Sequence, residues 1–164
     1  MEEEKNIHLL LVDDEENFLK TVASRLTLKN FNVSTAATGE EAIALAENSF
    51  FDVAVLDLQL PGIDGTKLLD VLKKKHKYLE IIILTGHGNV QSAVECTKLG
   101  AFGYLEKPFD FDKLIESIKD AYKLRLQKKF EHSLKRMEEI QKLSLRESPF
   151  GLLKALARLD DDEK

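Results

Sequence analysis

The sequence predicts an α/β protein with a five-stranded, doubly wound parallel sheet, followed by a helical C-terminal extension. Three observations lead to this prediction. Short apolar runs alternate with segments whose apolar residues recur at helical spacing, and such alternation builds parallel sheets. Several runs are apolar at nearly every position, as in strands covered on both faces. Beyond residue 122, helix-forming residues continue without glycine or proline to about Leu143, and a local break follows at Ser148 and Pro149.

Each strand and helix has its own pattern in the chain. The runs expected to form strands are residues 7–12, 32–36, 53–56, 81–84 and 103–105. The segments between and after them carry one apolar stripe each, which predicts one buried helix face per segment. In chain order the stripes are Phe18, Val22 and Leu26; Ala42, Leu45 and Ala46; Leu68, Val71 and Leu72; Val90, Val94 and Thr97; and Leu114, Ile115, Ile118 and Ala121.

Polar residues that favour helix starts precede three of these segments. Thr38 is followed three residues later by Glu41, the spacing of a capping box. Asn89 and Asp110 are candidate N-caps of the segments that follow them.

Composition limits the classes of protein to consider. The 164 residues suffice for one domain and an extension, and the net charge of −5 argues against binding nucleic acid through phosphate contacts. The single cysteine, Cys96, excludes an internal disulfide and a cysteine metal site. The start of the chain is acidic and no apolar stretch has membrane-spanning length. We therefore expect a soluble, cytoplasmic protein with no membrane partner.

Charged and polar residues follow four of the predicted strands. Asp13 and Asp14 end the first, Asp57 the third, Thr85 the fourth and Lys107 the fifth. The carboxyl ends of parallel strands meet at one edge of the sheet, where ligands of such sheets bind. Carboxylates crowded there repel one another, and Mg²⁺ relieves the repulsion through oxygen ligands. A carboxylate can accept a phosphoryl group, while an ammonium and a hydroxyl contact its oxygens.

Each of these residues also has a structural explanation when taken alone. Asp13 or Asp14 would cap the next helix, and Asp57 would serve as a turn residue. Thr85 would be structural and Lys107 solvated. Their coincidence at one edge of the sheet favours the functional interpretation.

Four stretches in order resemble the motifs of response-regulator receiver domains of two-component signalling, which have a flavodoxin-like sheet. The resemblance covers roughly residues 6–122, and the stretch Thr-Gly-His-Gly at residues 85–88 is most similar to receivers of the nitrogen-regulator type. The four are residues 11–15 (LVDDE), 55–65 (VLDLQLPGIDG), 83–86 (ILTG) and 100–109 (GAFGYLEKPF).

The resemblance implies a phosphoacceptor and a metal site. Asp57 would accept the phosphoryl group from a histidine kinase. Mg²⁺ would be bound by Asp14, Asp57 and the backbone carbonyl of Gln59, with Asp13 acting through a metal-bound water. Gln59 and His87 would tune dephosphorylation, with an exposed loop side chain as the structural alternative for both.

The resemblance also implies a switch. Lys107 would contact the phosphoryl group together with Thr85. Thr85 and Tyr104 would form the switch pair. The Lys107–Pro108 peptide bond would be cis.

Two rival classes share the sheet. A flavodoxin-like flavin binder needs a loop rich in Ser, Thr and Gly after the first strand, whereas residues 13–16 are consecutive acids. A haloacid-dehalogenase-type phosphatase has a second Asp two residues after its nucleophile, where this chain has Gln59. We therefore expect a phosphoacceptor switch and not an enzyme with an external product.

The chain is expected to divide into a receiver domain (residues 1–122), an extension of the last helix and possible coiled coil (123–147), and a short amphipathic helix with an acidic tail (148–164). The extension carries an apolar seam that favours a parallel homodimer. Fold-back of the segment after Pro149 over part of the seam is the alternative. The seam consists of Leu126, Phe130, Leu134, Met137 and Ile140.

A basic cluster lies on the same segment, but acidic residues interrupt it, so we expect a solvated helix face and no direct nucleic-acid partner. The alternative for the whole chain is a receiver fragment of a larger transcriptional regulator whose output domain is absent. In either case the downstream protein is unknown. The cluster is Arg125, Lys128, Lys129, Lys135 and Arg136.

Overall fold

The computed structural model describes residues 6–146 and 148–161. They divide into two compact units, one ending at Arg125 and the other beginning at Leu126. The strands are β1 (His8–Val12), β2 (Asn32–Ala36), β3 (Val53–Leu56), β4 (Glu80–Thr85) and β5 (Gly103–Glu106). The helices are α1 (Glu16–Leu28), α2 (Gly39–Asn48), α3 (Gly65–Lys75), α4 (Val90–Lys98), α5 (Phe111–Arg146) and α6 (Pro149–Asp161).

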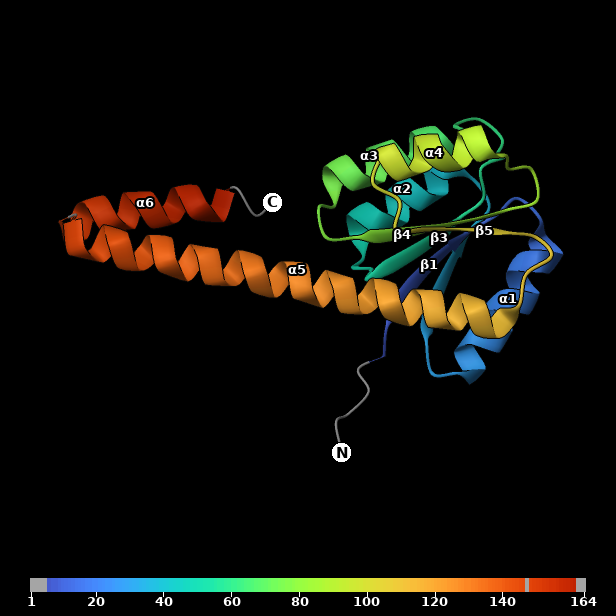
Figure 1. Ribbon diagram of the computed structural model, residues 1–164, viewed down its shortest axis with the longest axis horizontal. Helices are drawn as coiled ribbons and strands as arrows, with labels where there is room; N and C mark the ends of the chain where they lie inside the picture. Colours follow the sequence, from blue (N-terminus) through green and yellow to red (C-terminus); the bar gives the residue numbers. More distant parts are fainter. Residues whose placement is uncertain (1–5, 147, 162–164) are drawn as a thin grey trace. The chain divides into compact units, whose positions relative to one another are not determined.

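The first unit contains the predicted doubly wound sheet. All strand pairs are parallel, and the order is β2-β1-β3-β4-β5. Helices α2, α3 and α4 cover one face and α1 and α5 the other (Figure 1). In the register, Val12 is opposite Leu56, and Leu56 is opposite Ile83. The residues that follow these strands are therefore brought to the same edge.

The strand ends differ slightly from the predicted runs. β1 begins at His8, one residue later than expected, while β4 takes in Glu80 and Thr85 and β5 takes in Glu106. Ladder hydrogen bonds set these ends, and a polar residue forms them as readily as an apolar one. Apolarity alone therefore misplaces strand ends by a residue.

The predicted stripe of α4 is wrong. Val90 and Val94 are 81% and 49% exposed, and Thr97 is also exposed, whereas Cys96 is fully buried. α4 has few apolar residues, so more than one rotation of the helix matches its pattern. In α1 the buried face is similarly shifted, because Leu19 is buried and Phe18 only half-buried.

The predicted helix starts are confirmed. The Asn89 side chain accepts from the backbone N–H of Ser92 at 2.8 Å, and Ser92 Oγ accepts from Asn89 N–H, which completes a capping box. Thr38 Oγ1 accepts from the Glu41 backbone N–H at 3.2 Å. The Glu41 carboxylate accepts from the backbone N–H of residue 37, one residue before the cap. Asp110 Oδ1 accepts from a backbone N–H in the first turn of α5.

Arg125, in the first unit, is not on a solvated face. It is 4% exposed, and its Nε lies 3.0 Å from Asp52 Oδ1. Arg125 follows Ile118 and Ala121 on the buried side of α5, so its position in the helix and not its charge sets its burial. The prediction of a fully solvated basic cluster was therefore wrong at this residue.

In the second unit, α6 folds back along the C-terminal part of α5 (Figure 1). An ion pair between Arg136 and Asp160 joins the two helices, so Arg136 is also not simply solvated. Of the predicted seam, Ile140 is half-buried. The rest of the seam remains exposed: Leu126 (48%), Phe130 (64%), Leu134 (45%) and Met137 (67%). Among the described residues, no helix is both long and apolar enough to cross a membrane.

Candidate functional site

Three carboxylates meet at the C-terminal edge of the sheet. Asp13 and Asp14 follow β1 and Asp57 follows β3, the neighbouring strand. Each offers a ligand oxygen, and these oxygens all lie within 4.8 Å of one another. Asp13 and Asp57 are buried while Asp14 is exposed. The sequence therefore identified correctly the carboxylates that the fold brings together.

Backbone hydrogen bonds orient the two buried carboxylates. Asp13 Oδ1 accepts from the Glu15 N–H at 2.9 Å, and Asp57 Oδ1 accepts from the Gln59 N–H at 3.2 Å. In each side chain the other oxygen, Oδ2, accepts from the Lys107 ammonium. Gln59 reaches the site through its main chain, since its side chain is exposed.

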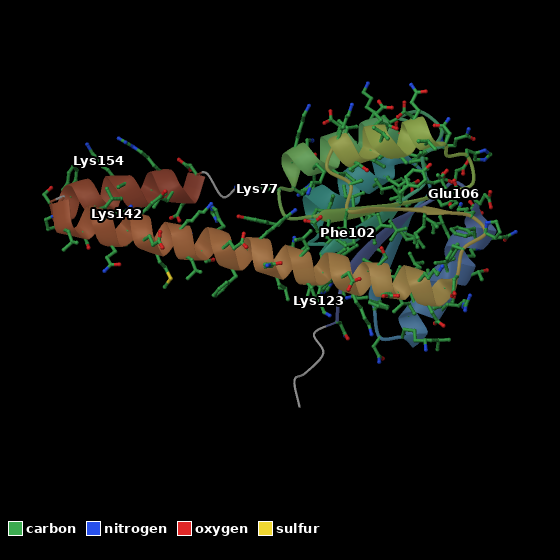
Figure 2. The ribbon with its side chains drawn as sticks, viewed as in Figure 1. Lys77, Phe102, Glu106, Lys123, Lys142 and Lys154 are labelled. Carbon is green, nitrogen blue, oxygen red and sulfur yellow. The ribbon has the colours of Figure 1, made fainter. Side chains whose placement is uncertain are left out.

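Lys107 comes from the loop that follows β5, directly after Glu106, which marks the end of that strand in Figure 2. Its Nζ donates to Asp13 and lies 3.3 Å from Asp57 Oδ2. Its backbone N–H donates to the carbonyl oxygen of Thr85 at 2.9 Å, which ties the loop to the end of β4. The Lys107–Pro108 peptide bond is cis, as the resemblance implies.

Burial and neighbouring charges shift the pKa values of Asp13 and Lys107. Burial raises the pKa of the Asp13 carboxyl above its ordinary value, although the hydrogen bond from Lys107 opposes the change. Burial by itself lowers the pKa of the Lys107 ammonium, but its hydrogen bond to Asp13 and the charges of Asp13 and Asp57 raise it overall. Lys107 therefore stays protonated beside the Asp13 carboxyl, whose charged form is disfavoured by burial.

Thr85 is fully buried at the end of β4. Its Oγ1 accepts from the backbone N–H of His87 at 3.1 Å, while the His87 side chain is exposed. The Tyr104 hydroxyl lies 3.2 Å from Ser92 Oγ, in the first turn of α4. A Cβ atom on Gly88 would lie 1.4 Å from the Tyr104 hydroxyl oxygen and 3.1 Å from the Thr85 methyl carbon. Gly88 therefore makes room for Tyr104 beside Thr85.

Three contributors to this site were missed in the sequence. Gly88 and Ser92 hold Tyr104, and Phe18 places its ring 4.0 Å from the Lys107 Nζ. The helical spacing of Phe18 suggests only a core stripe. Ser92 had a local signal, because it stands three residues after the helix cap Asn89, but its contact with Tyr104 is not local.

The residues present suit a hard divalent cation. Converging carboxylate oxygens are the ligands that Mg²⁺ prefers, and an exposed carboxylate such as Asp14 leaves a path for hydrated metal. The Lys107 ammonium bonds to two of these carboxylates, Asp13 and Asp57, and supplies a counter-charge.

Residues 9–119 match the family model described as the response regulator receiver domain. The chain belongs to the response regulator receiver family. Members of this family are phosphoacceptor switches of two-component signal transduction that are phosphorylated by histidine kinases, and they generally bind Mg²⁺ at such an acidic cluster.

Relatives and solved structures agree with this assignment. The receiver is 37% identical over 117 residues to a putative NtrX-like response regulator of Rickettsia felis, and 38% identical over 117 residues to the transcriptional regulatory protein GlrR of Escherichia coli. These alignments cover 70% and 71% of this chain but only 25% and 26% of the relatives. The chain thus spans about a quarter of the length of the curated relatives it matches.

A solved structure extends the comparison to the fold. The structure of a beryllofluoride-activated NtrC4 receiver domain dimer has a TM-score of 0.69 and 36% identity, covering 72% of this chain and 98% of that one.

Proposed function

We propose that this receiver accepts a phosphoryl group on Asp57 from a histidine kinase, with Mg²⁺, and releases no external product. The observation that carries the proposal is the geometry of Asp57. Its Oδ1 is held by the Gln59 N–H, while its Oδ2 faces the Lys107 ammonium beside Asp13. A carboxylate so placed has one oxygen available for attack and a cation next to it for the transferred oxygens.

The exposure of each carboxylate indicates its role in the metal site. Asp14, exposed at the mouth of the site, would bind Mg²⁺ directly together with Asp57 and the backbone carbonyl of Gln59. Asp13, which is buried and bonded to Lys107, would act through a metal-bound water. Bound Mg²⁺ would neutralise charge on the transferred phosphoryl oxygens.

The switch is a repacking of Thr85 and Tyr104. The Thr85 hydroxyl would turn from the His87 N–H toward the phosphoryl group, and the Tyr104 ring would then shift against Gly88 and α4. Phosphorylation biases such a pair of packings through its charge. Gln59 and His87, whose exposed side chains flank the site, would tune the rate of dephosphorylation.

The test of the acceptor is intact-mass spectrometry of the full chain after incubation with Mg²⁺ and a small phosphodonor. We expect the mass of one phosphoryl group to be added to the parent and to Asp64→Asn, a control in which the helix cap retains its acceptor oxygen. Asp57→Asn should remain unmodified. Equal labelling of Asp57→Asn would overturn the assignment, and retained metal affinity in Asp14→Ala would move the metal site elsewhere.

We also propose a parallel homodimer through the extension of α5. The fold-back of α6 leaves this surface open, because Phe130, Leu134 and Met137 stay exposed and only Ile140 is half-buried. Burying large apolar side chains contributes about 1.5–3 kcal/mol each, which is enough in sum to offset a substantial association cost. The similar NtrC4 receiver structure is itself a dimer.

Light scattering tests the dimer. At tens of micromolar we expect the full chain to scatter as a dimer, Leu134→Lys as a monomer, and the control Leu153→Lys at an exposed position of α6 as a dimer. A parent that stays monomeric with and without phosphorylation would refute this proposal and favour a different protein as the partner of the seam.

A further inference from the structure

The Lys107 ammonium has a neighbour that carries no charge. Besides Asp13 and Asp57, its Nζ lies over the ring of Phe18, 4.0 Å from the ring centroid. Phe18 stands in the first turn of α1 and is half-buried. The site is thus closed on one side by carboxylates and on another by an aromatic face, which attracts a cation through the ring quadrupole.

We propose that Phe18 is a positioning residue for Lys107, whose ring keeps the ammonium facing Asp57 when a divalent cation occupies the carboxylates. This inference rests on the proposed function. In the structure Lys107 is bonded to Asp13, whose carboxylate belongs to the cluster that would hold the metal. A metal there repels the ammonium and competes for the same oxygens. Lys107 then needs a second contact that does not compete with the metal.

The flexibility and partial exposure of the Lys107 side chain explain why a second contact is needed. Its four-carbon stem is flexible and its side chain is 17% exposed, so an ammonium displaced from Asp13 has a route to solvent. The Phe18 ring is neutral, binds no metal and already contacts Nζ. It therefore holds the ammonium close to Asp57, whose Oδ2 lies 3.3 Å from Nζ.

A second aromatic residue fixes the plane of the Phe18 ring. Phe109 meets it edge to face, with centroids 6.1 Å apart and planes at 75°. This geometry is favourable for aromatic pairs. Phe109 lies two residues beyond Lys107 in the same loop, so the segment that carries the lysine also orients the ring beneath it.

The contact has a spectroscopic signature that does not depend on activity. Protons above a ring face resonate upfield, so the ε-methylene of Lys107, assigned with Lys107→Met, should be shifted upfield of other lysines. We expect the shift to persist when Mg²⁺ is added, to vanish in Phe18→Leu and to remain in Phe18→Tyr. In the control Phe111→Leu, which removes a ring stacked on Arg25 in the same core cluster, it should be unchanged. Loss of the shift in the parent on adding Mg²⁺ would overturn the proposal.

The rate of Asp57 labelling provides a second test of the role of Phe18. At saturating Mg²⁺, Phe18→Leu should slow labelling of Asp57 by a small phosphodonor by roughly two- to thirtyfold, the range that a cation–π contact supports. Phe18→Tyr should stay within about twofold of the parent, and Mg²⁺ affinity should hardly change in either.

A double mutant separates positioning from a general structural role. In a Lys107→Met background, Phe18→Leu should cause no further loss. An equal loss in both backgrounds, or a parental rate in Phe18→Leu, would refute positioning. If the parent itself fails to label, the proposed function fails, while the persistence of the lysine shift with Mg²⁺ still decides the role of the ring.

Discussion

Arg125 and Asp52 form a buried ion pair at the end of β3 opposite to Asp57, with the arginine Nε 3.0 Å from Asp52 Oδ1. Asp52 Oδ2 also accepts from the His8 backbone N–H at 2.9 Å, and the Arg125 guanidinium lies over the Phe50 ring at 4.7 Å. One arginine of α5 is thereby fixed to the starts of β1 and β3. The ion pair anchors to the sheet the turn of α5 at which the first unit ends.

Replacing Arg125 by Met should destabilise the receiver by about 3–5 kcal/mol, because it leaves the Asp52 carboxylate buried without its cation, with the His8 N–H as a hydrogen-bond donor. Urea denaturation followed by circular dichroism measures the loss. The matched control is Lys123→Met at an exposed position of the same helix, which should change stability by less than about 0.5 kcal/mol. The double variant Arg125→Met with Asp52→Asn should recover much of the loss, and a double variant as unstable as the single one would contradict this account.

Asp13→Asn should stabilise the metal-free protein at neutral pH. Burial raises the pKa of Asp13 in the fold, so its ionised form is disfavoured there. The penalty is absent below the ordinary carboxyl pKa, about 4, grows as pH rises from there to the raised value, and stays constant above it. Asn keeps an oxygen for the Glu15 N–H.

Thermal unfolding checks this prediction. The gain should be on the order of 1 kcal/mol, or a few degrees in Tm, and should disappear near pH 3. Added Mg²⁺ should raise the Tm of the parent more than that of the variant, since a ligand stabilises only the form that binds it. A variant less stable than the parent at pH 7 without metal would be the opposite result.

Gly88→Ala should displace Tyr104. The added Cβ atom would overlap the Tyr104 hydroxyl oxygen, and such overpacking typically costs about 1–3 kcal/mol. Gly86→Ala is the control, because its Cβ atom would meet only the Cβ of Lys107 at 3.8 Å. Removing the ring with Tyr104→Ala should make Gly88→Ala nearly neutral. Equal melting temperatures for Gly88→Ala and Gly86→Ala in the parent background would disprove the clash.

Thr85→Ala should leave Asp57 able to accept a phosphoryl group but weaken the response at Tyr104. The variant loses the oxygen that accepts from the His87 N–H, at a cost of about 1 kcal/mol. Thr85→Ser retains the hydroxyl and should respond like the parent. Amide chemical shifts around Tyr104, recorded before and after phosphorylation, provide the measurement. A response of parental size in Thr85→Ala would show that the hydroxyl is not the link.

Much of the fold and the candidate site could be predicted because the decisive signals are local. Residues 53–56 and 81–84 are apolar throughout, as buried parallel strands require. The residue after each strand lies at one edge of the sheet, because the crossovers share one hand. The positions of the strand ends in the sequence were therefore enough to predict one shared site for Asp13, Asp14, Asp57, Thr85 and Lys107.

The relationships that failed or were missed depend on contacts between segments far apart in the chain. Val90 and Val94 fit a helical stripe, yet α4 turns Cys96 inward instead. Phe18 also fits a stripe, but its ring meets Lys107, 89 residues away. Composition made Arg125 look like part of a solvated cluster, whereas it is buried on Asp52.

By itself the sequence determined the succession of strands and helices along the chain, the caps of α2, α4 and α5, the carboxylate edge of the sheet and the continuation of the last helix beyond it. The tertiary structure decided the rotation of each helix, the partners of the long cationic side chains and which stripe of α5 faces α6. The physical reason is that backbone propensity and apolar period act over a few residues, whereas a helix with several weak apolar stripes is oriented only by the surface that packs against it.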